Sequence, residues 1–216
     1  MATVLYDYWR SSASYRVRIA LNMLGEEHEI VPVDLLTQEQ RSHAHLQRNP
    51  QGLVPVLAID GRTLTQSLAI IEYLDETRAA GFLPADAAGR ARVRALAHAI
   101  AMEIHPICNL RVATHAASLV GGGEEAVTAW MHTFIGEGLR AFEVMLSDGD
   151  AGDFCHGDSP GLADFCLVPQ LYNARRWQVD LSELHRIFRI ETNCARIAAF
   201  EAAHPDRVRP GTLGGS

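Results

Sequence analysis

Hydrophobic and polar positions follow different periods in the two parts of the chain. Over residues 1–82, short apolar runs alternate with segments in which apolar residues recur every three or four positions. This pattern predicts strands alternating with helices. The remainder keeps the helical period throughout, so we expect an α/β domain over residues 1–82 and an all-helical domain over residues 88–210.

In the first part, the expected order of elements is strand, helix, strand, weak polar helix, hairpin and helix. Gly25 ends the first helical pattern, as glycine often does. Asp60-Gly61 stands between two short apolar runs, which predicts a tight hairpin turn. Ser67 precedes the last helical pattern and is an N-cap candidate. The strand and helix patterns cover residues 4–8, 17–24, 28–33, 37–46, 54–64 and 68–74.

The second part shows four helical stretches. The first carries an amphipathic face from Val93 to Ile104, and Pro106 should kink it because proline cannot donate the backbone hydrogen bond. Gly121–Gly123 separates it from a helix that runs to about Leu146. Two further helices are expected over residues 162–177 and 187–200.

Composition excludes several classes of function. The 216 residues carry a net charge of -7 without a basic run, which argues against a nucleic-acid partner. No export leader and no apolar run of membrane-spanning length are visible, so we expect a cytoplasmic protein with no membrane association. The four cysteines lack C-x-x-C spacing and should be buried free thiols. The histidines show no metal pattern beyond His43 and His45, and we expect no metal.

The candidate chemistry is concentrated where the first strand meets the first helix. Trp9-Arg10-Ser11-Ser12-Ala13-Ser14-Tyr15-Arg16 brings hydroxyls and guanidiniums to a helix N-terminus. Unpaired backbone N–H groups and the helix dipole favour negative charge there. The segment therefore predicts a site for an anion or a thiolate, although a serine N-cap alone would also account for the hydroxyls.

Four segments in this order and spacing resemble the zeta class of the glutathione transferase superfamily, which includes maleylacetoacetate isomerases. They are Arg10–Leu21, Asn49–Pro55, Gln66–Leu74 and Leu162–Gln170. The resemblance covers essentially the whole length. It implies a thioredoxin-like N-terminal domain followed by an all-helical C-terminal domain, glutathione as cofactor, and a homodimer.

The resemblance also implies roles for particular residues. Ser11 is the first choice for the hydroxyl that lowers the pKa of the glutathione thiol, and Ser12 is a second donor. Val54, before a cis Pro55, would offer its backbone to the cysteinyl unit. The remaining expected glutathione contacts are Gln40, Gln66, Ser67, His105, Asn109 and Arg111. His105 and Asn109 are four positions apart and are expected to share a helix face.

Two positions depart from the family pattern. Ala13 stands where many zeta enzymes carry a cysteine, so the nucleophile should be the sulfur of glutathione. Gly161 stands where a Ser or Thr commonly caps a helix. Asp164 should nevertheless reach back to the capping N–H, and we interpret it as structural.

The implied substrate is a small cis-enoic dicarboxylate, bound by Arg10 and Arg176. The implied reaction is cis–trans isomerisation of maleylacetoacetate through reversible thiolate addition, with maleylpyruvate as the rival substrate. A conjugating transferase or peroxidase would use the same thiolate beside an apolar second site. A non-catalytic interaction module is the third alternative, and Ser11, Val54 and Ser67 argue against it.

Overall fold

The computed structural model describes residues 2–148 and 150–210, and the chain divides into two compact units. The first unit combines Met1–Phe82 with Ala195–Ser216, and the second is Leu83–Cys194. The two units meet in the chain between Phe82 and Leu83. The segment from Ala195 onward groups with the N-terminal unit rather than with the helices before it.

A four-stranded sheet organises the first unit. Its strands are β1 (Val4–Asp7), β2 (Glu29–Pro32), β3 (Val56–Ile59) and β4 (Arg62–Thr65), in the spatial order β2-β1-β3-β4. Strand β1 pairs in parallel with β2 and antiparallel with β3, and β3 pairs antiparallel with β4. This is the thioredoxin-like topology that was expected.

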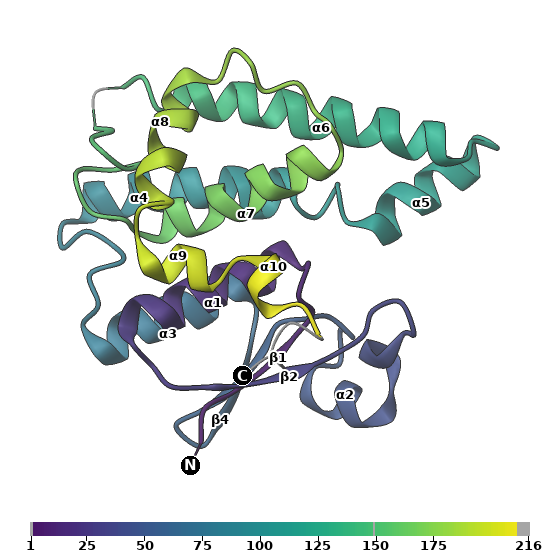
Figure 1. Ribbon diagram of the computed structural model, residues 1–216, viewed down its shortest axis with the longest axis horizontal. Helices are drawn as coiled ribbons and strands as arrows, with labels where there is room; N and C mark the ends of the chain where they lie inside the picture. Colours follow the sequence, from purple (N-terminus) through teal and green to yellow (C-terminus); the bar gives the residue numbers. More distant parts are fainter. Residues whose placement is uncertain (1, 149, 211–216) are drawn as a thin grey trace. The chain divides into compact units, whose positions relative to one another are not determined.

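The helices of this unit are α1 (Ser12–Leu24), the 3-10 turn η1 (Glu39–Arg41), α2 (His43–Arg48), α3 (Ser67–Arg78), α9 (Ala198–Ala202) and α10 (Pro205–Val208). Helices α1 and α3 pack together beside the sheet, and α9 packs against α1 (Figure 1). The apolar face predicted for α1 lies in the core, since Val17, Ala20 and Leu21 are fully buried. Gly25 ends α1 in the left-handed region, at φ 63°.

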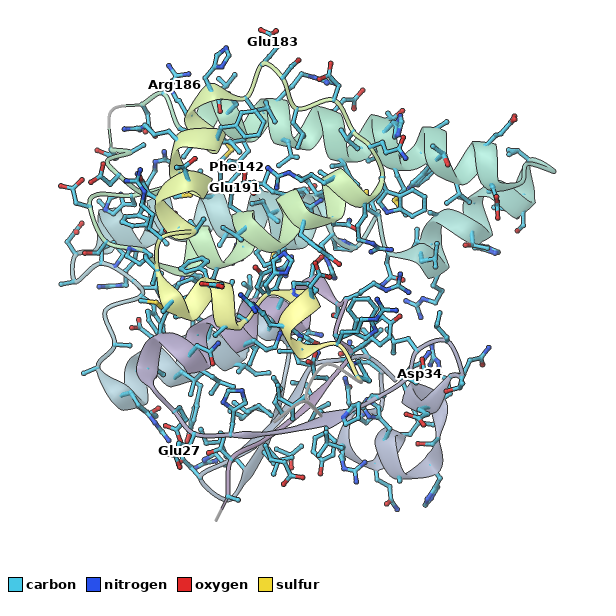
Figure 2. All side chains as sticks on the ribbon, viewed as in Figure 1. Glu27, Asp34, Phe142, Glu183, Arg186 and Glu191 are labelled. Carbon is cyan, nitrogen blue, oxygen red and sulfur yellow. The ribbon has the colours of Figure 1, made fainter. Side chains whose placement is uncertain are left out.

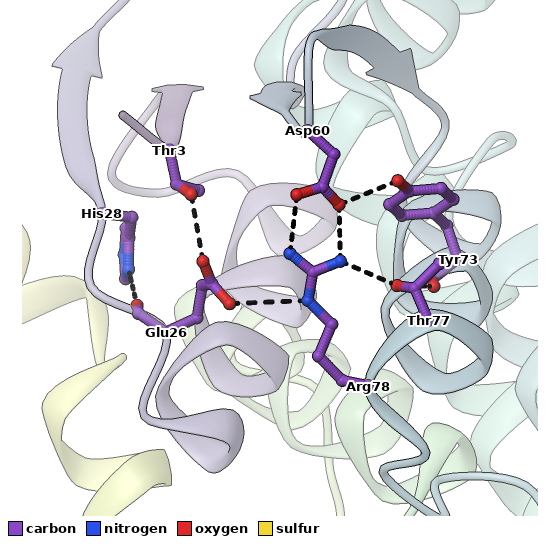
Figure 3. Close-up of polar contacts among 7 residues, drawn as sticks. All are labelled: Thr3, Glu26, His28, Asp60, Tyr73, Thr77 and Arg78. Carbon is purple, nitrogen blue, oxygen red and sulfur yellow. Dashed lines mark hydrogen bonds and ion pairs between the residues drawn. The ribbon is translucent and has the colours of Figure 1, made fainter. Parts of the chain in front are cut away.

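The predicted hairpin is present, and its turn is held by a polar cluster. Arg78, the last residue of α3, donates hydrogen bonds to both carboxylate oxygens of Asp60 in the β3–β4 turn (Figure 3). The Tyr73 hydroxyl donates to the same carboxylate at 2.8 Å. Glu26, just after α1, lies 3.6 Å from Nε of Arg78. The hydrogen bond from Arg78 is the main cause that lowers the pKa of Asp60 to about 2.

Two α1 side chains attach the C-terminal segment to the first unit. Asn22 donates to the carbonyl of Ala199 at 3.2 Å, and Arg18 donates to the carbonyl of Ala203 at 3.0 Å. The helix expected over residues 187–200 is instead two helices, α8 (His185–Cys194) and α9. The apolar pattern did not reveal that α8 belongs to the second unit and α9 to the first.

The regular elements in the described part of the second unit are helices, joined by turns and loops. It contains α4 (Ala87–His98), the π-helix η2 (Ala99–Ile104), α5 (Leu110–Leu119), α6 (Glu124–Met145), α7 (Leu162–Arg176) and α8. The helix predicted to kink one turn before Pro106 passes into a π-helical turn there and ends before the proline. The chain leaves the helix at His105, the C-cap of η2, and α5 starts after its N-cap Asn109.

Buried carboxylates fix two helix starts in this unit. Glu143 of α6 accepts from the backbone N–H groups of Arg186 and Ile187, both at 2.9 Å, at the beginning of α8, where Figure 2 shows Arg186. Asp164 accepts from the N–H groups of Gly161 and Cys155, each at 2.9 Å. Burial raises the pKa of Asp164, and its interpretation as a structural cap is consistent with both bonds.

All four cysteines are free and buried, as predicted. Burial raises the pKa of the Cys108 thiol to about 11, and it raises the pKa values of Cys155 and Cys194 as well. These thiols are therefore poor nucleophiles at neutral pH. Within the described ranges, none of the helices is both long and apolar enough to span a membrane. The same ranges contain no group of three or more His, Cys, Asp or Glu side chains suited to a metal.

Candidate functional site

The hydroxyl-rich segment occupies the start of α1, as the sequence predicted. Ser11 is the N-cap, with extended backbone, and its Oγ accepts a hydrogen bond from the N–H of Ser14 at 3.2 Å. Ser11 is half-buried, whereas Ser12 and Ser14 are buried. The Ser11 oxygen acts as an acceptor in this bond, so its own O–H is available to a further acceptor. A partly accessible hydroxyl donor thus stands beside the positive end of a helix.

The segment before β3 contains the predicted cis peptide bond, between Val54 and Pro55. Two side chains donate to the carbonyl just before it, that of Leu53. They are Nε2 of His45 and Nδ2 of Asn49, each at 2.9 Å. His45 and Asn49 are 2% and 3% exposed. A carbonyl can only accept, so Nε2 of His45 carries a proton in this contact.

The start of α3 brings together a serine, a glutamine and a buried arginine. Ser67 is the first helical residue and Gln66 is the N-cap, so the prediction that Ser67 caps this helix is wrong. Gln66 has a positive φ of 68° and donates from its side chain to Gln51 Oε1 at 2.7 Å. Arg16, which is 2% exposed, donates to Ser67 Oγ at 3.3 Å.

This arrangement is suited to a carboxylate. The guanidinium can only donate, so when Ser67 accepts from Arg16 its own hydroxyl proton is available to a further acceptor. The buried positive charge of Arg16 and the N-terminus of α3 both favour an anion at this place. Gln40 lies in η1 of the same unit, and its buried Oε1 has no hydrogen-bond partner among the described residues.

Arg10 is held by the aromatic residues that precede it. Its Nη2 donates to the Tyr8 hydroxyl at 3.0 Å, and its guanidinium carbon lies 4.8 Å from the Trp9 ring centroid. Such cation–π contacts restrict the guanidinium without neutralising it. Arg10 therefore remains a full positive charge one residue from Ser11.

The other predicted site residues belong to the second unit. His105 is the C-cap of η2, whereas Asn109 is the N-cap of α5 and accepts from the N–H of Arg111 at 3.1 Å. The expectation that His105 and Asn109 share a helix face is wrong, because the helix ends between them. Arg111 is exposed in the first turn of α5, and Arg176 is exposed at the C-terminus of α7.

Sequence reasoning missed three residues that support the site. Arg16 was noticed only as part of the basic segment, His45 only as a weak metal candidate, and Asn49 only within a motif. Each acts through contacts with residues distant in sequence or through backbone atoms, for example Arg16 with Ser67, which is 51 residues away. All three side chains are buried although they lie in polar segments, and the spacing of residues in the sequence does not reveal this burial.

Known proteins match both the sequence and the structure. The family model described as "Glutathione S-transferase, N-terminal domain" matches residues 1–76. A maleylacetoacetate isomerase of Rhizobium meliloti (strain 1021) is 62% identical over 209 residues, covering 96% of this chain and 98% of the relative. A maleylpyruvate isomerase of a Ralstonia species is 44% identical over 203 residues, covering 93% and 96%.

Two solved structures are similar over nearly their full lengths. A bacterial zeta-class maleylpyruvate isomerase in its holo form has a TM-score of 0.92 at 42% identity, with 96% of this chain and 99% of the other covered. A maleylacetoacetate isomerase from Anaeromyxobacter dehalogenans, with glutathione bound in its active site, has a TM-score of 0.86 at 47% identity, with 98% of each covered.

A thioredoxin-like sheet, a helical unit and these relatives define a glutathione transferase. The chain belongs to this superfamily, in the zeta class that contains the maleylacetoacetate and maleylpyruvate isomerases.

Proposed function

We propose that this protein is a glutathione-dependent cis–trans isomerase that converts maleylacetoacetate to fumarylacetoacetate, in the breakdown of tyrosine and phenylalanine. The observation that carries the proposal is the hydrogen bond that Ser11 accepts from Ser14, which leaves the Ser11 hydroxyl proton for a thiolate. The relatives named maleylacetoacetate isomerase support the choice of reaction.

The residues of the first unit fit glutathione. Its γ-glutamyl carboxylate would be held by Gln66 and Ser67, where Arg16 adds positive charge. Its cysteinyl backbone would pair with Val54, before the cis Pro55. Gln40 would serve the glycyl end, where its buried Oε1, which lacks a partner among the described residues, could accept from the glycyl N–H. Of the second unit, His105, Asn109 and Arg111 are proposed as further contacts.

Glutathione, when bound, supplies a thiolate that adds reversibly beside the substrate double bond and so permits rotation. The protein's task is to keep that sulfur deprotonated and in position. Ser11 donates to it, Ser12 is a second donor, and the N-terminus of α1 favours its negative charge. Together these groups would need to lower the thiol pKa by about two units from about 8.5.

The arginines would bind the substrate. Two carboxylates need cationic donors in a chain whose net charge is -7. Arg10 carries a full positive charge next to Ser11 and would bind one carboxylate and stabilise the oxyanion that develops. Arg176 is proposed to bind the other carboxylate.

Maleylpyruvate is the rival substrate, because the structure with a TM-score of 0.92 is a maleylpyruvate isomerase. Both substrates are cis-enoic diacids, and the same arginines would serve either. A conjugating transferase or a non-catalytic module is less well supported, since the first would have no use for Arg10 and the second no use for Ser11. We further propose a cytoplasmic homodimer, from the family resemblance and from four thiols that remain unpaired.

The test is isomerisation by the purified protein. Maleylacetoacetate and maleylpyruvate are each supplied with and without glutathione, and the cis–trans conversion is followed by absorbance. We expect conversion only with glutathione, without consumption of the thiol, and a higher kcat/KM for maleylacetoacetate. Equal rates without glutathione would refute the mechanism, and a higher kcat/KM for maleylpyruvate would change the assigned substrate. Failure to bind a glutathione resin would favour the non-catalytic module.

A further inference from the structure

One buried guanidinium joins three separate parts of the first unit. Arg18 of α1 is 1% exposed and donates to Asp7 Oδ2 at 2.6 Å, to the carbonyl of Trp9 at 3.0 Å and to the carbonyl of Ala203 at 3.0 Å. Asp7 ends β1, Trp9 lies in the loop that leads to α1, and Ala203 follows α9. Every nitrogen of the guanidinium therefore has an acceptor.

The position of Trp9 gives these contacts a consequence for the site. Trp9 immediately precedes Arg10 and Ser11, and its carbonyl is fixed by a charged donor that is itself held by Asp7. Hydrogen bonds to charged groups are stronger than neutral ones, and a buried ion pair resists displacement. Arg18 thus holds the backbone immediately before Arg10 and Ser11, through the carbonyl of Trp9.

The C-terminal segment contacts the same loop at a second point. The guanidinium carbon of Arg209 lies 5.2 Å from the Trp9 ring centroid, and that of Arg10 lies 4.8 Å from it. Trp9 is therefore fixed through its carbonyl by Arg18 and contacted through its ring by a residue of the C-terminal segment. The C-terminal segment therefore contacts the loop that carries Trp9, Arg10 and Ser11 directly, through Arg209.

We propose that Arg18 is a positioning residue for the thiolate site: it sets the place of the Arg10–Ser11 backbone and couples it to the C-terminal segment at Ala203. The inference rests on the proposed function, because it assigns Ser11 to the glutathione thiol. Asp7 takes part in the same positioning, since it binds the guanidinium that donates to the carbonyl of Trp9. Arg18 itself touches neither glutathione nor substrate in this role.

The test is the Arg18→Lys variant. Lysine keeps the charge beside Asp7 but has no planar fork to serve both carbonyls at once. If the loop shifts, Ser11 loses alignment and the pKa of the bound glutathione thiol rises by about one unit, from about 6.5 to about 7.5. This rise reduces the thiolate fraction about threefold at pH ~7, and the reduction approaches about tenfold well below the pKa. The readouts are thiolate absorbance of the glutathione complex against pH, kcat, and the KM for glutathione. We expect kcat to fall with the thiolate fraction and this KM to change less than about twofold, because Gln66 and Ser67 are untouched.

The matched control is Arg78→Lys. Arg78 is another arginine of the first unit that binds a carboxylate, but it is only partly buried, and it contacts the hairpin turn rather than the loop that carries Trp9 and Arg10. This variant should lose stability while the thiol pKa and kcat stay at wild-type values. An Arg18→Lys protein with wild-type thiol pKa and kcat would overturn the proposal.

A second variant covers the case in which Arg18→Lys does not fold. The double variant Asp7→Asn with Arg18→Gln replaces the ion pair with two neutral amides, and one amide donor cannot reach both carbonyls. The same rise in thiol pKa is expected. Loss of folding in both variants would assign Arg18 to stability alone and overturn the proposal. Absence of glutathione-dependent turnover in the wild type would instead refute the proposed function, so the two failures are distinguishable.

Discussion

The Oγ of Ser11 accepts a hydrogen bond from the backbone N–H of Ser14 at 3.2 Å, so these two serines have opposite roles at the start of α1. Ser11 caps the helix and has a hydroxyl proton to give. Ser14 contributes its backbone, while its own fully buried hydroxyl has no partner among the described residues. A pair of matched variants follows from this difference.

Ser11→Ala is expected to lower kcat about a hundredfold or more, the usual effect of removing one donor to a developing negative charge. It should also cost about 1 kcal/mol of folding stability, because the cap is lost. Ser14→Ala should leave kcat within about twofold and leave stability almost unchanged, since the deleted hydroxyl makes no bond within the described chain. Steady-state kinetics and thermal unfolding measure both effects, and Ser11→Thr tests whether the hydroxyl suffices. Equal losses of kcat in the two alanine variants would contradict the role given to Ser11.

Arg176→Ala should raise the KM for the dicarboxylate substrate about 10- to 100-fold, because a charge-assisted hydrogen bond is worth about 1.5–3 kcal/mol. The pKa of the glutathione thiol should not change. Arg175→Ala is the control, since Arg175 is the neighbouring residue on α7 and pairs with Glu191 instead. A substrate KM that rises equally in both variants would contradict the assignment of Arg176.

Local chemistry made much of the fold predictable. The Asp60-Gly61 turn, the Ser11 start of α1 and its Gly25 end depend on residues adjacent in sequence, and all three are observed. Short-range rules describe such features because the interacting atoms belong to neighbouring residues. The cis bond before Pro55 is also observed, but it was implied by the family resemblance.

The features that could not be predicted depend on distant partners. Arg18 and Ala203 are 185 residues apart, so no local pattern indicates that the C-terminal segment belongs to the first unit. The start of α3 was misplaced by one residue, because Gln66 adopts a positive φ that non-glycine residues rarely take and whose cause lies in the surrounding structure. The π-helical turn before Pro106 separated His105 from Asn109, a change that helical spacing cannot reveal.

The two donors on the Leu53 carbonyl should act together. His45→Phe or Asn49→Ala alone leaves one donor and is expected to cost about 1 kcal/mol of stability. The double variant leaves the carbonyl without either donor, so its loss should exceed the sum of the single losses by about 1 kcal/mol. Glutathione affinity should fall in the same order, because this carbonyl precedes Val54.

Urea denaturation measures the double-mutant cycle, and calorimetric titration with glutathione measures the affinity. Ala44→Gly serves as a control for general weakening of α2, since Ala44 is an exposed residue of the same helix. It should reduce stability without reducing glutathione affinity. Additive losses in the cycle would mean that the two donors do not share one acceptor in solution.

The cluster at the hairpin turn predicts a pH dependence of stability. The hydrogen bond from Arg78 lowers the pKa of Asp60 from 3.8 to about 2. A carboxyl with a lowered pKa in the folded state stabilises the protein above its unfolded-state pKa, and the contribution disappears as pH falls through the folded-state value. The contribution of Asp60 should therefore be complete above pH ~4 and be lost between pH ~4 and ~2.

Asp60→Asn removes this contribution, so the variant should be less stable than the wild type at pH 7, and the difference should shrink as the pH falls below 4. Urea denaturation at pH 7, 5, 4 and 3 measures the difference directly. Glu183→Gln is the control, because Glu183 is exposed and makes no ion pair or hydrogen bond with any residue that the structure describes (Figure 2). Its difference from the wild type should stay near zero at every pH. A difference for Asp60→Asn that stays constant from pH 7 to 3 would mean that Arg78 does not bind the ionised carboxylate, and the cluster would then stabilise the hairpin through packing alone.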